Sequence, residues 1–131
     1  ECVEFNDLLK ARGIDPVFLL SPTTEKSRVD LIVQQASGFV YYVSLKGVTG
    51  AKNLDIDEVA DRVAAIRKQT NLPVGVGFGV RDAATAKAVA GIADAVVVGS
   101  RMVQTIETST VDNVVANLTA LTVELRAAID A

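Results

Sequence analysis

The stretch PVGVGFGV, residues 73–80, decides the fold that the sequence predicts. Val74, Val76 and Phe78 alternate with three glycines, and the run is typical of a short buried strand. Glycine weakens the interior of a strand, so three of them at alternate positions need a reason. Because alternate residues of a strand point to the same face, one face here is bare backbone that another group can approach closely.

Further apolar runs of the same kind follow one another along the chain, and segments with helical spacing separate them. The expected strands are 16–21, 39–45, 73–78 and 93–99, and the expected helices are 23–38, 55–71, 81–91, 101–107 and 110–131. The chain opens on a helical pattern of its own, with Val3, Phe5, Leu8 and Leu9 on one side. This alternation predicts a parallel sheet with right-handed crossovers. Four strand–helix units fit an open doubly wound sheet or half of a (β/α)8 barrel, and both bind ligands at the carboxyl ends of their strands.

Composition narrows the class of protein. The chain has 131 residues, of which half are hydrophobic and 22% charged, which indicates one globular domain with a real core. The net charge of −3 and the scattered basic residues argue against nucleic acid, and no apolar run approaches the ~18 residues of a membrane span. A single cysteine, Cys2, favours the reducing cytoplasm, and the absence of histidine excludes histidine catalysis and histidine-ligated metal. Because the chain begins inside a helical pattern and without Met, we expect a piece of a longer protein.

Two of the expected strands lead through glycine directly into a helix. Gly79 precedes the helix 81–91, and Gly99 and Ser100 precede the short helix 101–107. Helix N-termini bind phosphate through unpaired N–H groups and the positive end of the dipole, and glycine lets the phosphate approach the backbone. Neighbouring parallel strands bring the two sites together, in an arrangement that recurs in (β/α)8 barrels. A glycine at a strand end, taken by itself, usually only forms a turn, but the two sites together with the short helix favour a phosphate site.

The sequence offers no acid–base catalyst beside this predicted phosphate site. No Asp or Glu ends a strand: Asp15 and Asp94 precede strands, at the opposite rim, and Asp82 has the position of a helix cap. The loop 44–55 is long for its class and suits either a lid or a solvated surface loop. Lys46 in that loop has a position that suits a Schiff base, although a solvated lysine is the simpler interpretation. We therefore expect no catalytic residue and no metal ligand on this chain.

The motifs together resemble a known family. SLKGVTG (44–50), GVGFGV (75–80) and VVVGSRMV (96–103) resemble, in order and spacing, the last three strand–loop segments of the tryptophan synthase alpha chain family, and PVFLLSPTT (16–24) is similar to the preceding strand and loop. The resemblance covers essentially the whole chain. It implies an α/β fold that is the C-terminal half of a (β/α)8 TIM barrel, so that 1–131 is one partial domain from helix 4 to helix 8.

The resemblance also implies an activity and a set of site residues. The family cleaves indole-3-glycerol phosphate to indole and glyceraldehyde 3-phosphate in tryptophan biosynthesis, has no cofactor, and passes indole to a pyridoxal-phosphate-dependent beta chain. Matching positions assign the phosphate to Gly50, Gly79, Gly99 and Ser100, and the indole pocket to Tyr41, Thr49, Gly77, Phe78 and Val97. Gly77 would let the backbone pass close to the ring, and Thr49 matches the threonine of a mobile closing loop.

The chain departs from the family in what it lacks. The family's catalytic glutamate and aspartate lie on and after barrel strand two, which has no counterpart here, so we expect no appreciable aldol activity from this chain by itself. Half a barrel leaves sheet edges unpaired and an apolar inner face uncovered, so the expected partners include the missing N-terminal half-barrel or a second half-barrel. Two alternatives stay open: a non-catalytic phosphate-binding half-barrel, and another phosphosugar isomerase or epimerase. The second would be expected to carry an acid or histidine at a strand end, and this sequence has none there.

Overall fold

The computed structural model describes residues 3–43, 56–77 and 79–131. Its elements are α1 (Val3–Lys10), β1 (Phe18–Leu20), α2 (Lys26–Gln35), β2 (Val40–Val43), α3 (Ile56–Arg67), β3 (Val74–Gly77), α4 (Ala83–Ala90), β4 (Ala95–Val97), α5 (Ser100–Glu107) and α6 (Val114–Asp130). From β1 onward each element lies within its expected range, except that α5 begins one residue earlier. The alternation of strands and helices that the sequence predicts is therefore confirmed.

The four strands form one parallel sheet in the order β1-β2-β3-β4. Each strand pairs with the next in sequence, and Leu19, Tyr41, Gly75 and Ala95 stand in one row across the sheet. A doubly wound sheet reverses its strand order at a switch point, whereas a barrel continues in one direction. The strand order therefore favours the barrel over the open sheet.

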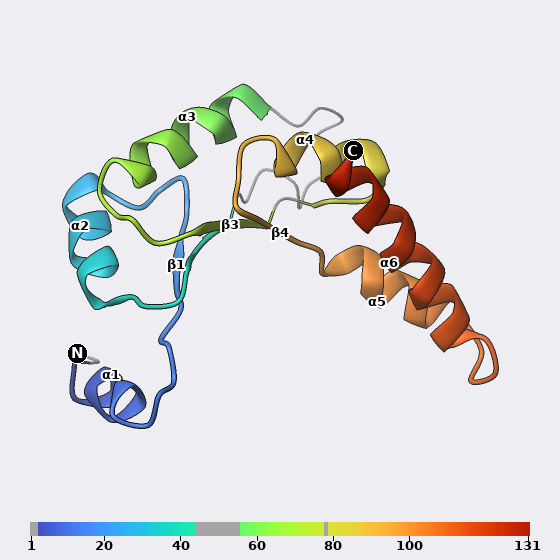
Figure 1. Cartoon of the computed structure of the whole chain (residues 1–131), viewed down its shortest axis with the longest axis horizontal. Coiled ribbons are helices and arrows are strands. Elements are labelled where there is room, and N and C mark those ends of the chain that lie inside the picture. Colours follow the sequence, from blue (N-terminus) through green and yellow to red (C-terminus); the bar gives the residue numbers. More distant parts are fainter. Residues whose placement is uncertain (1–2, 44–55, 78) are drawn as a thin grey trace.

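Helices cover one face of the sheet and form the core with it. Figure 1 shows α2, α3 and α4 in an arc around one side of the strands. Five strand residues on this face are almost fully buried: Leu20, Val40, Tyr42, Val74 and Val76. The helices supply Val29, Val59, Val63, Ile66, Ala86, Val89, Leu121 and Leu125. Val and Ile at helical spacing on α3, and apolar residues at alternate positions on the strands, are what the sequence periods predicted.

The opposite face of the sheet is open. Leu19 on this face is 60% exposed, Ala95 is exposed, and Tyr41 and Val97 are only half-buried. A parallel sheet is normally covered on both faces, so this is the inner face of an incomplete barrel. The expected uncovered apolar face is thus confirmed for the described residues.

The first helix differs from what its apolar pattern leads one to expect. Val3, Phe5 and Leu8 are each more than half exposed, whereas Asn6 is 2% exposed and its Nδ2 has no hydrogen-bond partner. Figure 1 shows α1 apart from the arc of helices, at the N-terminal end of the chain. The helix is present as predicted, but in this structure its apolar side is not packed on a core.

Candidate phosphate site at the carboxyl edge of the sheet

Gly79 and Ser100 line the same cavity, which has a volume of about 430 Å³. They follow β3 and β4, which pair directly in the sheet. The remaining lining residues are Val80, Arg81, Arg101, Gln104 and Glu107. The predicted convergence of the two glycine-to-helix junctions is therefore confirmed as geometry.

Gly79 has a backbone that only glycine adopts readily. Its φ is +53°, in the left-handed region, and the chain then turns inward so that Val80 is buried in the core. Asp82 caps α4: its Oδ1 accepts hydrogen bonds from the Thr85 N–H at 2.8 Å and from Thr85 Oγ1 at 2.6 Å. The Thr85 hydroxyl bond, then the Thr85 backbone bond, hold the pKa of Asp82 below its ordinary value. The sequence prediction of a cap at Asp82 is confirmed.

No side chain caps the N-terminus of α5, whereas Asp82 caps that of α4. Gly99 is the N-cap of α5, has no side chain to bond the first turn, and would place a Cβ within 4 Å of no other atom. The helix starts at Ser100, and its first turn presents N–H groups that no side-chain cap satisfies. The two junctions are therefore unequal: α5 offers its helix terminus to an anion, whereas at Gly79 the available donor is the backbone of the turn.

Charged side chains surround the cavity, and the sequence analysis missed them. Arg81 and Arg101 both line it, and Arg101 Nη1 donates to Gln104 Oε1 at 3.2 Å. Glu107, in the last turn of α5, also reaches the cavity although it ends no strand. The available signal was an arginine two residues after Gly79, in GVRD, and two residues after Gly99, in GSRM.

Three of the residues assigned to the indole pocket lie on the open face of the sheet. Gly77 and Val97 are paired across β3 and β4, and Gly77 is paired with Val43 of β2, two residues beyond Tyr41. A Cβ built on Gly77 would lie 2.1 Å from Tyr41 Oη and 2.7 Å from the Tyr41 ring. In this structure, therefore, the aromatic ring for which Gly77 makes room is that of Tyr41.

The other glycine of the strand has a related role. A Cβ on Gly75 would lie 3.3 Å from the ring of Phe39, which precedes β2. The two glycines of β3 thus let two aromatic side chains from the neighbouring chain segment lie across the sheet. Gly75 therefore makes room for the ring of Phe39.

Several predicted residues lie outside the described part of the chain. Thr49, Gly50 and Phe78 belong to this group, as does Lys46. Among the residues that are described, no group of three or more Cys, Asp or Glu is placed to hold a metal ion. Likewise, none of the described helices is long and apolar enough to cross a membrane.

Asp94 lies at the opposite rim of the sheet, as predicted. Its Oδ2 accepts a hydrogen bond from the Val74 N–H at 2.8 Å, and its Oδ1 lies 2.9 Å from Arg67 Nη2. The bond from Val74, followed by that from Arg67, holds the pKa of Asp94 below its ordinary value. This carboxylate fastens the start of β3 to the end of α3, and it is remote from the cavity at the carboxyl edge.

A parallel sheet in sequential order, helices on one face and a cavity where its last two strands end define a protein of the (β/α)8-barrel class, of which this chain forms four successive units. The family model for the tryptophan synthase alpha chain matches residues 1–130. The chain belongs to the tryptophan synthase alpha chain family.

Individual relatives agree with this assignment. The chain is 60% identical over 129 residues to the tryptophan synthase alpha chain of Chromobacterium violaceum, covering 98% of this chain and 49% of that protein. It is 58% identical over 131 residues to that of Thiobacillus denitrificans, covering all of this chain and 48% of the relative. A structure of Mycobacterium tuberculosis tryptophan synthase superposes with a TM-score of 0.83 at 33% identity, over 98% of this chain and 47% of the other. The chain thus spans about half the length of the curated relatives it matches.

Proposed function

We propose that this chain is the substrate-binding half of a tryptophan synthase alpha chain, the lyase that cleaves indole-3-glycerol phosphate to indole and glyceraldehyde 3-phosphate in tryptophan biosynthesis. The observation that carries the proposal is the shared cavity of Gly79 and Ser100, at the ends of adjacent strands and at the uncapped start of α5. The substrate phosphate binds there through the main-chain N–H groups of Gly79, Gly99 and Ser100. The Ser100 hydroxyl supplies one more donor, and Gly50 adds a fourth amide by resemblance.

The charges of the cavity suit a phosphate dianion. Two guanidinium groups, of Arg81 and Arg101, and one carboxylate, of Glu107, line it. Oxyanions accept stronger hydrogen bonds from arginine than from neutral donors, and Arg101 is already oriented by Gln104. Glu107 opposes this attraction, so the main-chain donors and the α5 dipole contribute most of the binding of the phosphate.

The indole ring binds on the open face of the sheet. Tyr41 and Val97 line that face, and the Tyr41 ring already occupies the space above Gly77. An indole ring therefore packs beside Tyr41 and against Val97. Thr49 and Phe78 complete the pocket by resemblance. The ring and the phosphate are thus held at one edge of the sheet, which fixes the bond to be broken between them.

The chemistry itself requires groups that this chain does not supply. In the cleavage, the indole ring gains a proton and the glycerol hydroxyl loses one. The bond that breaks joins the ring carbon to the carbon that carries this hydroxyl. An acid and a base must be within hydrogen-bond reach of those atoms. The family's catalytic glutamate and aspartate belong to the other half of the barrel, so this chain orients the substrate and is inactive alone.

The remaining partners follow from the same assignment. The open sheet face receives the N-terminal half-barrel in the whole protein, and a second half-barrel is the alternative occupant. A beta chain that carries pyridoxal phosphate consumes the indole, whereas the alpha chain needs no cofactor. The expected location is the cytoplasm.

An assay of indole release tests this proposal. The purified chain alone is expected to release indole from indole-3-glycerol phosphate at the rate of a buffer blank. Addition of a separately produced N-terminal half-barrel from a relative such as the Chromobacterium violaceum protein is expected to restore release. Full activity of the chain alone, or no indole from the whole protein, contradicts the proposal.

A further inference from the structure

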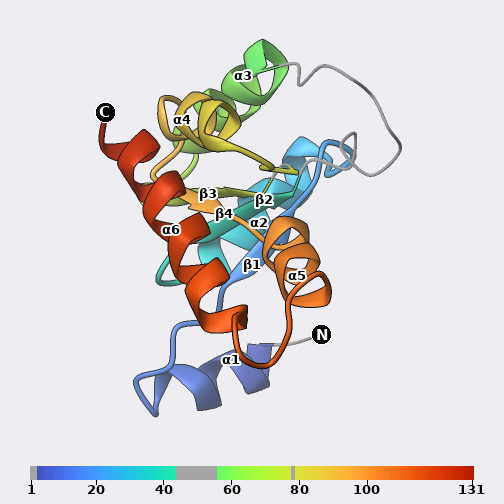
Figure 2. The same cartoon turned by 90° about the vertical axis from the view of Figure 1, so that its right-hand side faces the viewer.

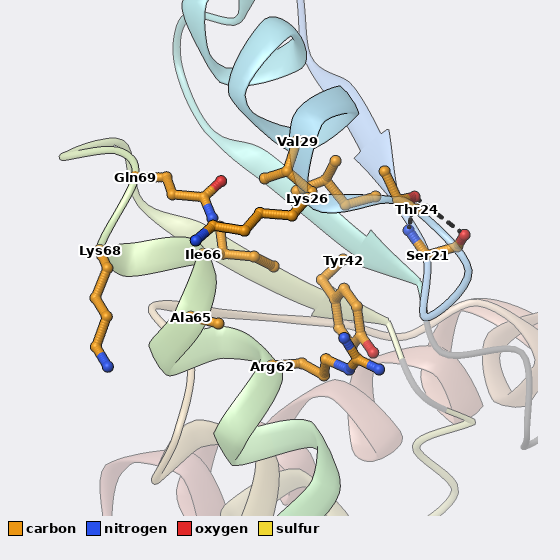
Figure 3. Close-up of a pocket in the computed structure, with 11 residues that line it drawn as sticks. Ser21, Thr24, Lys26, Val29, Tyr42, Arg62, Ala65, Ile66, Lys68 and Gln69 are labelled. Atoms are coloured by element: carbon orange, nitrogen blue, oxygen red, sulfur yellow. Dashed lines mark hydrogen bonds between the residues drawn. The ribbon is translucent and has the colours of Figure 1, made fainter.

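A second cavity lies between α2 and α3, on the helix-covered side of the sheet. Its volume is about 460 Å³, within the range of small-molecule sites. Its walls come from β1, α2, β2 and α3 and from the turns that follow β1 and α3, and they share no described residue with the cavity at Gly79 and Ser100. Figure 3 shows the side chains that surround it. Neither the phosphate nor the indole pocket uses this cavity.

The floor of the cavity is apolar. Leu20 and Tyr42 come from the sheet, and Val29 and Ile66 come from the two helices. All four are core residues with at most 8% of their surface exposed. A ligand here would lay an apolar body on a rigid surface that the fold has already formed.

The rim of the cavity is positively charged. Lys26 starts α2, Arg62 lies on α3, and Lys68 follows the end of α3. No Asp or Glu is among the described residues that line the cavity, and none of the three cations has an ion-pair partner in that part of the chain. In Figure 3 Lys26 extends from α2 toward α3 and Arg62 extends toward Tyr42, whereas Lys68 extends away from both. Lys26 and Arg62 therefore face a cavity to which the described residues bring no counter-charge.

One polar atom in the wall is left without a partner. Gln69 Oε1 is buried and accepts no hydrogen bond, although buried acceptors are nearly always satisfied. The hydroxyls on the opposite wall are occupied with one another: Thr24 Oγ1 accepts from the Ser21 N–H at 3.0 Å and lies 3.2 Å from Ser21 Oγ. Because Gln69 also lines the cavity, a donor on a molecule bound there would satisfy this atom.

We propose that this cavity binds a small organic anion, with an apolar body on the Leu20–Ile66 floor. Its carboxylate or phosphate head lies between Lys26 and Arg62, and a hydroxyl or amide N–H donates to Gln69. The guanidinium fork of Arg62 suits either oxyanion. This site is separate from the proposed substrate site and does not depend on the assignment of that site.

The test measures probe binding to the whole protein by titration calorimetry or by chemical-shift changes. The probe is 3-(4-hydroxyphenyl)propanoate, which carries an aromatic body, a carboxylate and a hydroxyl donor. Its neutral amide is the control for charge, and 2-(4-hydroxyphenyl)ethyl phosphate replaces the head group. We expect the carboxylate to bind at least about tenfold more tightly than the amide, because a charge-assisted hydrogen bond usually contributes that much affinity. The anion that binds more tightly indicates the head group of the natural ligand. The proposal is overturned if neither anion binds at concentrations up to about 10 mM.

Two pairs of variants locate the binding. Lys26→Gln and Arg28→Gln each remove one positive charge from α2, but only Lys26 lines the cavity. Ala65→Leu and Ala64→Leu each enlarge an exposed alanine of α3, but only Ala65 lines it. We expect K26Q to weaken binding about tenfold and A65L to abolish it, while R28Q and A64L stay within about twofold of wild type. Equal losses of probe affinity within either pair of variants overturn the proposal. Thermal melts check that all four variants fold.

Discussion

Tyr41 lies across Gly77 so closely that a single added methyl group would collide with it. The Cβ of an alanine at position 77 would fall 2.1 Å from Tyr41 Oη, well inside van der Waals contact. The two residues come from β2 and β3, adjacent strands of the sheet. The glycine in the middle of the best strand signal is thus explained by its neighbour on the next strand.

Gly77→Ala is expected to destabilise the protein by about 1–3 kcal/mol, because overpacking forces Tyr41 out of its position. Gly75→Ala is the matched control, since its Cβ would stand 3.3 Å from the Phe39 ring and needs only a small shift. Urea unfolding of the whole protein measures both. The double variant Tyr41→Ala/Gly77→Ala should recover part of the loss that Gly77→Ala causes, and strictly additive effects would contradict the contact.

Gly79→Ala is expected to cost about 1–2 kcal/mol of stability, because alanine is strained at the positive φ of this position. Gly91→Ala provides the comparison: its φ is −67° and the nearest atom to a new Cβ is 3.5 Å away. That substitution should be neutral or stabilise by up to about 1 kcal/mol. Equal destabilisation by the two changes would contradict the left-handed conformation at Gly79.

Arg101→Gln is expected to raise the KM for indole-3-glycerol phosphate about tenfold with little change in kcat, because it removes a charged donor that binds substrate and transition state alike. Arg126→Gln is the control, since Arg126 pairs with Asp130 on the exposed surface of α6. Steady-state kinetics of the whole protein distinguish them. An unchanged KM in R101Q would show that the guanidinium does not reach the phosphate.

Asp94→Asn is expected to make stability less dependent on pH in acid. The Val74 and Arg67 bonds lower the pKa of Asp94 in the folded state from its ordinary value of 3.8. A lowered folded pKa contributes stability that is present above the unfolded pKa and is lost as pH falls through the folded value. In chemical unfolding curves, the wild-type protein should therefore lose its higher free energy of unfolding relative to D94N below about pH 4. A constant difference between the two proteins from pH 7 to acid would contradict this.

The sequence predicted the features that depend on local pattern. The period of apolar residues located α3 and β3, and the position of Asp82 just before a helical segment allowed the cap to be recognised. The glycine junctions after β3 and β4 predicted that these two chain segments come together, and Gly79 and Ser100 line one cavity, because neighbouring parallel strands end at the same edge.

Features that depend on tertiary placement could not be predicted from the sequence. The Tyr41–Gly77 contact depends on the register of β2 against β3, which no local pattern specifies. The approach of Arg101 and Glu107 to one cavity depends on the orientation of α5, which packs beside α6 as Figure 2 shows. The apolar side of α1 was read correctly as a helix face, but the pattern does not specify what packs on it.

We propose that the glycine junctions after β3 and β4 hold the substrate phosphate. A crystal structure of the whole protein with indole-3-propanol phosphate tests this directly. Phosphate oxygens are expected within hydrogen-bond distance of the backbone nitrogens of Gly79 and Ser100, with the indole ring beside Tyr41. A phosphate held by Arg81 alone, or bound away from the start of α5, would contradict it.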